Sequence, residues 1–579
     1  MHPALGFDVF ARLPPAYKRV ATSAARGDGK DLQRLETFIR TSSETQAIAT
    51  LPAFYANLDA LSIPSVAQLE TSLPAPLPIS IGKAVIALKN LGILTNLRSF
   101  PPDALLELWP RVWAWVEFLH NNRHYVHNGA DISIDVKTYI TWCLLLMNLQ
   151  AHTPTRLLMV HHPGIQAVVT RAWILTVDVA DQERDEVFAK AQFMFLLDPK
   201  NPVNLDQILD EVGGTFDDLA ALAVRHLRKV IPRRAETTTF WSAIGTFLDD
   251  MEHKSVPFKD ALLANGAVVA LVNTIRGMNV DIHPIMPPMC SALLTILQRL
   301  LNYPPGYTAI SEALDAGLLH TIALCGADPA VKNLLDVVSP SMVYYPVISR
   351  MEHCIRDVEA LTAKISFRKA FIYPAWKEFH ALYERRLSTL KYFHSKPRVS
   401  LKACENLDCK TPIGPKSQFK RCSSCQTAHY CSSTCQTLDW KHGGHREICK
   451  NLRSVRFCEP PLGARERGFL RVLLHEQYQK ARPELLRQQS SASRSRPGVG
   501  LYTSFDYTAP QGDATIKLRS ILDAQRHAPT PDWAVLWNYY TARLQRSQGT
   551  LELHLLKVME GQQPRMRLFP MRMLGTQFA

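Results

Sequence analysis

The sequence predicts a mainly α-helical protein that ends in a short cysteine-rich segment and a small α+β region. Three observations predict this arrangement. Apolar residues recur at three- and four-residue spacing along residues 1–395, which is typical of helices that pack on one another. Seven of the twelve cysteines fall between Cys404 and Cys449. The final stretch, residues 501–579, combines β-rich runs with a single helical run.

The bulk composition is that of a soluble globular protein. At 579 residues, with 46% hydrophobic and 20% charged residues, the chain is long enough for several domains. No apolar run approaches the roughly 18 residues that a membrane span needs, so no membrane association is expected. The N-terminus lacks a basic start followed by an apolar core, so no secretory signal is expected either. We therefore expect an intracellular protein, in nucleus or cytoplasm, where clustered cysteines usually bind metal.

Charge is concentrated at the C-terminal end. The chain carries a formal net charge of +14. From residue 380 onward there are about 32 Lys and Arg against about 15 Asp and Glu, so the preceding residues are close to neutral. A basic C-terminal third could bind acidic proteins, RNA or DNA. The alternative is a solvated basic surface with a disordered linker.

The N-terminal part reads as consecutive helices separated by short turns. Clear helical runs are 30–40, 83–97, 104–120 and 136–150. A glycine precedes an apolar helical run about every 50 residues, at Gly164, Gly214, Gly266 and Gly317. This pattern resembles armadillo- or HEAT-like helical repeats, which share one continuous core. An irregular helical domain is the alternative.

The sequence suggests five segments. The stretch 489–500 is poor in apolar residues and rich in Ser and Arg, which favours a flexible linker. Near the C-terminus the runs 551–560 and 565–573 flank a Gly-Gln-Gln-Pro turn and predict a hairpin. The expected divisions are a helical domain over 1–395, a zinc-finger-like segment over 404–449, a helical extension over 450–488, the linker over 489–500 and an α+β region over 501–579.

The cysteine-rich segment has the spacing of a metal centre. Its candidate ligands are Cys404, Cys409, Cys422, Cys425, Cys431, Cys435, His445 and Cys449. Eight ligands make two tetrahedral Zn²⁺ sites of four ligands each with no open position, which is typical of structural rather than catalytic zinc. Cys422-x-x-Cys425 forms a knuckle, whereas the pairs Cys431/Cys435 and His445/Cys449 are each one helical turn apart.

This segment resembles the MYND zinc finger family. The resemblance covers 419–449, with Cys-x-x-Cys, Tyr-Cys-x3-Cys-Gln, Asp-Trp and His-x3-Cys in order, preceded by the pair in 404–409. Two features depart from the family pattern. Four residues rather than two separate the first pair, and two extra residues after Trp440 make His442 a competitor for His445. The preserved His-x3-Cys spacing to Cys449 favours His445.

The resemblance implies an interleaved, cross-braced ligation. One ion would take Cys404, Cys409, Cys431 and Cys435, and the other would take Cys422, Cys425, His445 and Cys449. It also implies a role in protein–protein contact, with a proline-containing peptide as partner. The peptide would contact Ser423, Gln436 and Trp440, of which the last two lie on one helical face. The alternative is that Trp440 fills the small core of the finger.

Other functions find less support in the sequence. No P-loop, dinucleotide-binding, hydrolase or kinase motif is present, so no enzymatic activity is expected. A SET-type lysine methyltransferase is disfavoured because neither its Asn-His cofactor segment nor its Gly-rich strand flanks the finger. Nucleic-acid binding by the basic C-terminal third remains an alternative, although the finger lacks the helix that enters the major groove.

Histidines and lone cysteines outside the finger receive structural interpretations. His120, His124 and His127 are spaced as ligands, yet they close a helix without a fourth ligand, which favours a solvated helix end. Cys143, Cys290, Cys325 and Cys354 stand alone in apolar surroundings and are expected in the core. Cys458 follows the finger but breaks its spacing, so we expect it to take no part in metal binding.

Overall fold

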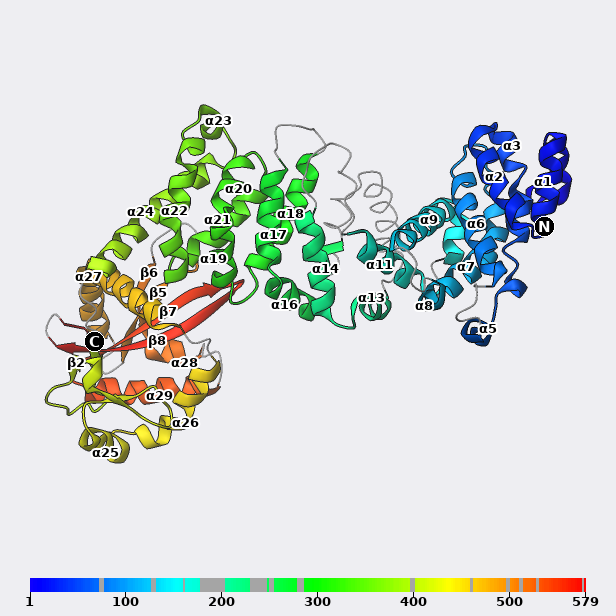
Figure 1. Cartoon of the computed structure of the whole chain (residues 1–579). Helices are drawn as coiled ribbons and strands as arrows, with labels where there is room; N and C mark the ends of the chain where they lie inside the picture. The colour runs from blue at the N-terminus through cyan, green and yellow to red at the C-terminus, as the bar shows by residue number, and fades with distance from the viewer. Residues whose placement is uncertain are drawn as a thin grey trace. The chain divides into compact units, whose positions relative to one another are not determined.

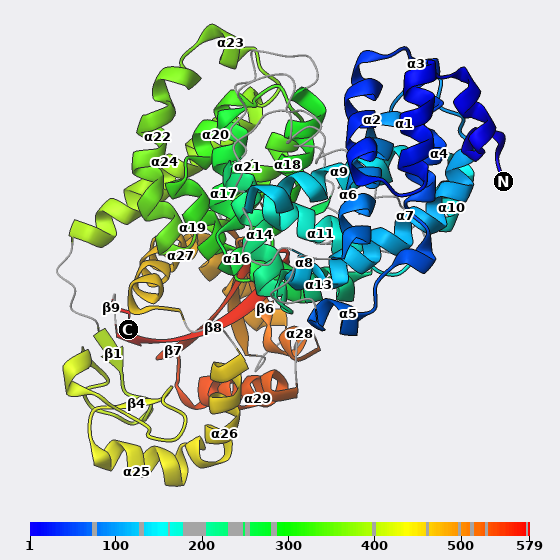
Figure 2. The ribbon, with the colours of Figure 1, turned by 45° about the vertical axis from the view of Figure 1, so that its right-hand side comes forward.

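A computed structural model provides the structure of the chain (Figures 1 and 2). It describes residues 1–71, 78–126, 132–159, 162–177, 204–229, 247–248, 255–278, 286–395, 401–458, 462–495, 500–509, 514–526, 531–574 and 577–578. The chain forms two compact units, Met1–Ile296 and Leu297–Ala579. The predicted fold class is confirmed, because helices dominate both units while the second also contains the finger and a small sheet.

The first unit is built from helices that bury one face against their neighbours. In α2 the buried positions Leu32, Leu35, Phe38 and Ile39 follow the helical period. Among the described residues no single helix is long and apolar enough to cross a membrane; α16 and α17 meet that criterion together by length and composition, but they are bent by 72° at their junction. The helices are α1 (Pro15–Ala25), α2 (Gly29–Thr41), α3 (Glu44–Ile48), α4 (Leu51–Ala56), α5 (Val66–Thr71), α6 (Ile79–Leu94), α7 (Ala104–Asn121), α8 (Arg123–Val126), α9 (Ile132–Ala151), α10 (Thr153–Met159), α11 (Ile165–Thr176), α13 (Leu205–Val212), α14 (Phe216–Lys229), α16 (Val256–Ala264) and α17 (Ala267–Gly277).

The four glycines at 50-residue spacing share one backbone conformation. Gly164, Gly266 and Gly317 are the N-caps of α11, α17 and α20 (Leu318–Leu324), with φ of 90°, 78° and 99°. Gly214, two residues before α14, has φ of 92°. A side chain is disfavoured in this left-handed region, so glycine is the residue that fits there. The shared left-handed conformation agrees with the regular glycine spacing in the sequence. That the helices form an armadillo- or HEAT-like repeat array stays a prediction.

His120 is buried, contrary to the solvated helix end that the sequence suggested. Its side chain at the end of α7 is 4% exposed, and its Nδ1 lies 2.8 Å from the hydroxyl of Tyr139 on α9. Its Nε2 lies 3.6 Å from a carboxylate oxygen of Glu211 on α13. The expectation was wrong because two helices distant in sequence cover this helix end. His124 is exposed as expected, and His127 lies outside the described residues.

The second unit begins with helices that continue the helical part of the chain. Its boundary falls inside α18 (Met286–Leu301) rather than at residue 395. In both views α22 and α24 lie side by side, joined by the short α23 (Figures 1 and 2). The further helices are α19 (Tyr307–Asp315), α20, α21 (Ala330–Ser341), α22 (Tyr345–Thr362), α23 (Ile365–Arg368) and α24 (Tyr373–Ser395).

The C-terminal region forms a five-stranded sheet in the order β6-β5-β7-β8-β9. The pair β5/β7 is parallel and the other pairs are antiparallel. The strands are β5 (Leu501–Asp506), β6 (Thr515–Ser520), β7 (Leu551–Glu560), β8 (Gln563–Leu574) and β9 (Gln577–Phe578), and the helices beside them are α27 (Ala464–Ser495), α28 (Ile521–Arg526) and α29 (Pro531–Arg546).

Helices cover both faces of this sheet. Tyr502, Leu553 and Leu555 share a buried cluster with residues of α29. On the alternate positions His554 contacts Tyr478 of α27, with ring centroids 5.0 Å apart. Because successive side chains of a strand point to opposite faces, α29 lies on one face and α27 on the other.

The tip of the β7/β8 hairpin is anchored on the helices of the same unit. The backbone N–H of Gln562 donates to the carbonyl of Asn302 at 2.8 Å, and the Tyr344 hydroxyl donates to the carbonyl of Met559 at 3.0 Å. These contacts join helices after residue 297 to the sheet of the same unit. The flexible linker expected over 489–500 is wrong for its first part, because α27 continues as a helix to Ser495; residues 496–499 lie outside the described residues.

Candidate metal centre

Two small hairpins and two helices position the eight candidate ligands. Strand β1 (Leu401–Ala403) pairs with β2 (Ile413–Pro415), and β3 (Lys420–Arg421) pairs with β4 (His429–Tyr430). Helix α25 (Ser433–His442) carries Cys435, and α26 (His445–Cys458) carries His445 and Cys449. The Ser432 hydroxyl accepts from the backbone N–H of Cys435 at 3.1 Å, which caps α25 at its first ligand.

The Cys422–Cys425 knuckle is a tight turn that aims both sulfurs the same way. The N–H of Gln426 donates to the carbonyl of Cys422 at 2.9 Å, and Gln426 itself has a left-handed φ of 53°. The N–H of Thr427 donates to Cys425 Sγ at 3.5 Å. A backbone N–H aimed at a sulfur stabilises its thiolate form, which is the form that binds metal.

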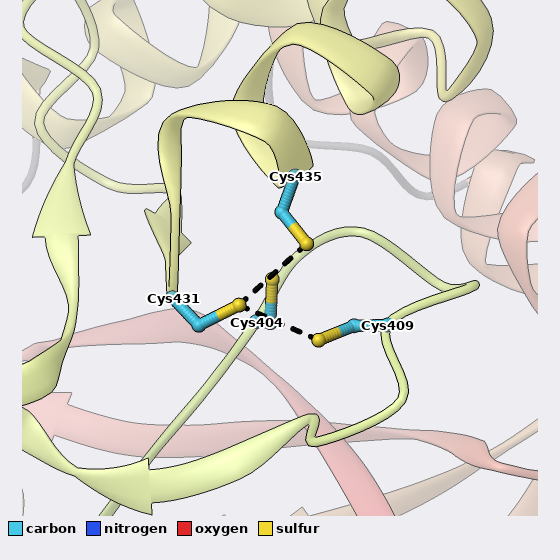
Figure 3. A group of neighbouring side chains, drawn as sticks. All are labelled: Cys404, Cys409, Cys431 and Cys435. Carbon is cyan, nitrogen blue, oxygen red and sulfur yellow. Dashed lines mark hydrogen bonds between the residues drawn. The ribbon is translucent and has the colours of Figure 1, made fainter.

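The first cluster consists of Cys404, Cys409, Cys431 and Cys435, whose sulfurs face one another (Figure 3). Cys431 Sγ lies 3.5 Å from Cys409 Sγ and 3.5 Å from Cys435 Sγ. Zn²⁺ with Zn–S distances of about 2.3 Å places its tetrahedral ligands about 3.8 Å apart, whereas a disulfide needs about 2 Å. The spacing therefore fits four thiolates around one zinc ion.

The second cluster consists of Cys422, Cys425, His445 and Cys449, all of them buried. Cys422 Sγ lies 3.8 Å from Cys449 Sγ, and Cys425 Sγ lies 3.7 Å from His445 Nε2. These distances also match a tetrahedral zinc site. The exposed His442 lies at the end of α25 and is not part of the cluster, so the structure selects His445.

Both clusters have the chemistry of structural zinc sites. Burial raises the pKa of the Cys425 thiol to about 11, so the charge of a metal ion is needed to keep it ionised at neutral pH. Each set supplies four ligands and leaves no position for a substrate. The prediction of two structural Zn²⁺ ions is confirmed, and the two ligand sets are the interleaved ones that the resemblance implied.

A buried ion pair that sequence reasoning missed attaches the finger to the C-terminal region. Arg543 of α29 donates from Nη1 to Asp439 Oδ1 at 2.9 Å, and the Tyr430 hydroxyl donates to Asp439 Oδ2 at 2.8 Å. Arg543 Nη2 donates to the carbonyl of Glu405 and lies 3.3 Å from its carboxylate. Burial alone would lower the pKa of Arg543, but Glu405, Tyr539 and Asp439 raise it above its ordinary value.

The finger and the C-terminal region also share one apolar core. Cys422, Cys425 and Cys449 belong to the same buried cluster as Trp537 and Tyr540 of α29. Figures 1 and 2 both place α26 beside α29, in agreement with their contacts. Asp439 belongs to the Asp-Trp motif that the sequence showed. Its partner Arg543 lies 104 residues later, so the sequence did not reveal this docking.

The three candidate peptide-binding residues lie at or near the surface of the finger. Trp440 is 37% exposed, and its ring lies 5.7 Å from that of His445. Gln436, one turn earlier on α25, is half-buried, and Ser423 is exposed in the knuckle. Trp440 is therefore partly packed against a metal ligand and partly open to solvent. Its role in binding a peptide stays a prediction.

Comparisons with known proteins agree with this geometry. Residues 403–449 match the family model described as the MYND finger. An F-box protein of Arabidopsis thaliana is 44% identical over 45 residues, which are 8% of this chain and 12% of that protein. Ubiquitin carboxyl-terminal hydrolase 19 of Arabidopsis thaliana is 51% identical over 40 residues, which are 7% of this chain and 6% of that protein. The similarity thus spans a small part of these relatives, and no solved structure matches the chain.

Proposed function

We propose that the MYND finger at residues 403–449 binds a protein partner, and that the partner presents an extended, proline-containing segment. The site comprises Gln436 and Trp440 on α25 with Ser423 in the knuckle. The two zinc ions hold these positions and take no part in chemistry. We further propose that the chain has no enzymatic activity and works inside the cell, in nucleus or cytoplasm.

The exposure of Trp440 carries this proposal. A tryptophan whose role was only to fill the core of a small finger would be buried, as Tyr430 is at 0% exposure, whereas Trp440 is 37% exposed. Its open ring can pack against a proline ring, and the Gln436 amide one turn away can bond the backbone of an extended peptide. Tryptophan is also among the residues that most often dominate binding energy at interfaces.

Binding of fluorescent proline-containing peptides to the zinc-loaded full chain tests the proposal. Trp440→Ala is expected to weaken the binding of any peptide selected by the wild type by about 30-fold, which corresponds to roughly 2 kcal/mol for an interfacial tryptophan. Replacing the prolines of that peptide with alanine should weaken it as well. Zinc stoichiometry is measured in parallel, because Trp440 touches the His445 ring.

Leu438→Ala is the matched control. Leu438 is 45% exposed on the same helix, so it is at least as accessible as Trp440. Two residues correspond to about 200° of rotation around a helix, so Leu438 points away from the proposed face. Equal losses in both variants, or full binding by Trp440→Ala with both zinc ions retained, would reject this face as the peptide site.

A further inference from the structure

One arginine of the C-terminal sheet lies beside the first zinc site without a hydrogen-bonded carboxylate. Arg572 belongs to β8 and is 6% exposed. Its Nη2 donates to the carbonyl of Leu407 at 3.0 Å, inside the loop that joins Cys404 and Cys409. Within the part of the chain that the structure describes, its Nε and Nη1 have no hydrogen-bond partner. We propose that Arg572 is a positioning residue of this site, which balances its charge and holds its loop.

The net charge of the first site favours a cation close by. Four thiolates around Zn²⁺ carry a net charge of −2, whereas three thiolates and a neutral histidine carry −1. A buried anion is costly unless an opposite charge lies close by, and the same holds for a buried guanidinium. Burial and the like charge of Arg543 lower the pKa of Arg572, whereas the charges of Glu405, Cys404 and Cys409 act in the opposite direction, and the Glu405 carboxylate already pairs with Arg543. With Glu405 paired elsewhere, the thiolates of Cys404 and Cys409 are the remaining anions that favour the charged form of Arg572.

The unusual spacing of the first ligand pair explains the role of the loop contact. Cys404 and Cys409 enclose four residues, and a loop of that length is not closed by the short turn of a Cys-x-x-Cys knuckle. The N–H of Cys409 donates to the carbonyl of Asn406 at 3.2 Å, and two arginines from outside the finger add further contacts to the loop. Arg543 binds the Glu405 carbonyl, and Arg572 binds the Leu407 carbonyl.

The middle of the same loop also contacts the metal centre. The Asn406 amide donates to Cys435 Sγ at 3.5 Å, so the position of the loop determines a contact to a ligand sulfur. Groups that orient metal ligands in this way typically change metal affinity by about 10- to 100-fold when removed. Strand β8 therefore supports, through Arg572, a loop that contacts a ligand of the first zinc site.

The second site supplies an internal reference. Its ligands are all buried, and Cys422, Cys425 and Cys449 sit in the apolar cluster shared with α29. Three of the four ligands of the first site are only half-buried. Loss of Arg572 should therefore affect the first site selectively, which separates a local electrostatic effect from unfolding of the finger.

The test compares full-length wild type with Arg572→Met, Arg572→Lys and Arg567→Met. Arg567 is an equally buried arginine of β8 that pairs with Glu560 at the other end of the hairpin, so its loss controls for general weakening of the strand. Zinc release to a chromogenic chelator is followed over time, and alkylation of each cysteine is mapped by mass spectrometry.

For Arg572→Met we expect one of the two zinc ions to be released about 10- to 100-fold faster, with matching alkylation of Cys409, Cys431 and Cys435. The second site should stay protected, Arg572→Lys should lie near wild type, and Arg567→Met should retain both ions. Unchanged release from Arg572→Met, or equal loss of both ions in the two methionine variants, would overturn the proposal. Equal release from Arg572→Lys and Arg572→Met would overturn the charge balance.

Discussion

The first unit and the finger reach a stable fold by different means. In Met1–Ile296 the largest fully buried side chains include four tryptophans, Trp109, Trp115, Trp142 and Trp173. In the part of 401–449 whose burial the structure describes, the buried apolar residues other than cysteine are Pro412, Ala428, Tyr430 and Ile448. Burying a large side chain contributes roughly 1.5–3 kcal/mol, so the first unit has an ample apolar driving force and the finger does not.

Metal and ion pairs replace apolar burial in the finger. A segment this small needs a staple, and two zinc ions cross-brace early and late parts of it. The contrast teaches that the two regions should respond to different perturbations. Chelation and charge removal should act on the finger, whereas protonation of buried histidines should act on the first unit.

Removing zinc should give the largest difference between the two regions. Structural zinc is worth on the order of 10 kcal/mol in finger peptides, more than the few buried residues of 404–449 can supply. A strong chelator, or Cys422→Ser, is expected to abolish hydrogen-exchange protection across 404–449. Peptides from α6, α7 and α9 should keep their protection. Exchange mass spectrometry on the full chain, with and without added Zn²⁺, makes the comparison.

Either of two results would contradict this account. Protection of 404–449 that survives complete chelation would mean that packing against α29 suffices to hold the finger. Simultaneous loss of protection in α6, α7 and α9 would mean that the first unit depends on the metal. Restoration of protection by Zn²⁺ but not by Mg²⁺ would identify thiolate ligation as the cause, because Mg²⁺ prefers oxygen ligands.

Breaking the buried ion pair should have the next largest effect. Arg543→Leu leaves the Asp439 carboxylate, 1% exposed, without its guanidinium partner. Removing one member of a buried pair typically costs about 3–5 kcal/mol. We expect the finger and α29 to lose protection together at a lower urea concentration, in saturating zinc, while the first unit is unchanged. Hydrogen exchange or proteolysis at increasing urea concentration, followed in peptides from the finger, α29 and the first unit, measures this shift.

Two further variants sharpen this prediction. Arg546→Leu removes an exposed arginine of the same helix that donates to the carbonyls of His442 and Gly443, and it should cost less than about 1 kcal/mol. The double variant Arg543→Leu, Asp439→Leu should recover part of the loss, because neither charge is then left unpaired. A double variant as unstable as the sum of the single ones would show that the two residues do not act as a pair.

The finger could be predicted from the sequence and its surroundings could not. The eight ligands are close in sequence and obey fixed spacings, so the presence of two zinc sites follows from local chemistry, whereas the pairing of the ligands came from the resemblance to the MYND family. Arg543 and Arg572 lie more than a hundred residues beyond their targets, and nothing local marks them among the many arginines of this basic region. The division at Ile296 was likewise not predicted. Residues just after it contact the distant β7/β8 hairpin, as Asn302 does at Gln562, and no local signal in the sequence marks such a contact.

The helical part shows the same limit at single residues. Periodicity predicted the helices and their buried faces, because amphipathic spacing is a local signal. It could not reveal that His120 meets Tyr139 and Glu211, which come from helices later in the chain. Sequence reasoning therefore placed a buried histidine at a solvated helix end, and the pH response of the first unit could not be foreseen.

Acidification should lower the free energy of unfolding of the first unit by a smaller amount, which is measured at peptides of that unit. His226 of α14 is 0% exposed and accepts a hydrogen bond at Nδ1 from the Trp173 indole N–H at 2.8 Å. Burial lowers the pKa of His226 to about 3, below its ordinary value near 6.5. The depressed pKa means that its contribution is fully present above about pH 6.5 and is lost as pH falls towards 3. Between pH 7.5 and 5.0 the unfolded state gains about 2 kcal/mol from protonation of this histidine.

His226→Gln tests this, because the glutamine oxygen can accept the same hydrogen bond and does not titrate. Urea unfolding read at α11 and α14 peptides should show a loss between pH 7.5 and 5.0 that is about 2 kcal/mol smaller in the variant than in wild type. His124→Gln, at an exposed position, is the matched control and should keep the wild-type pH dependence. Acid also protonates the thiolates of the finger and so releases zinc. Reading only the α11 and α14 peptides separates the effect of His226 from this loss of zinc. Identical pH dependence of wild type and His226→Gln would show that the Trp173–His226 pair opens before the unit unfolds.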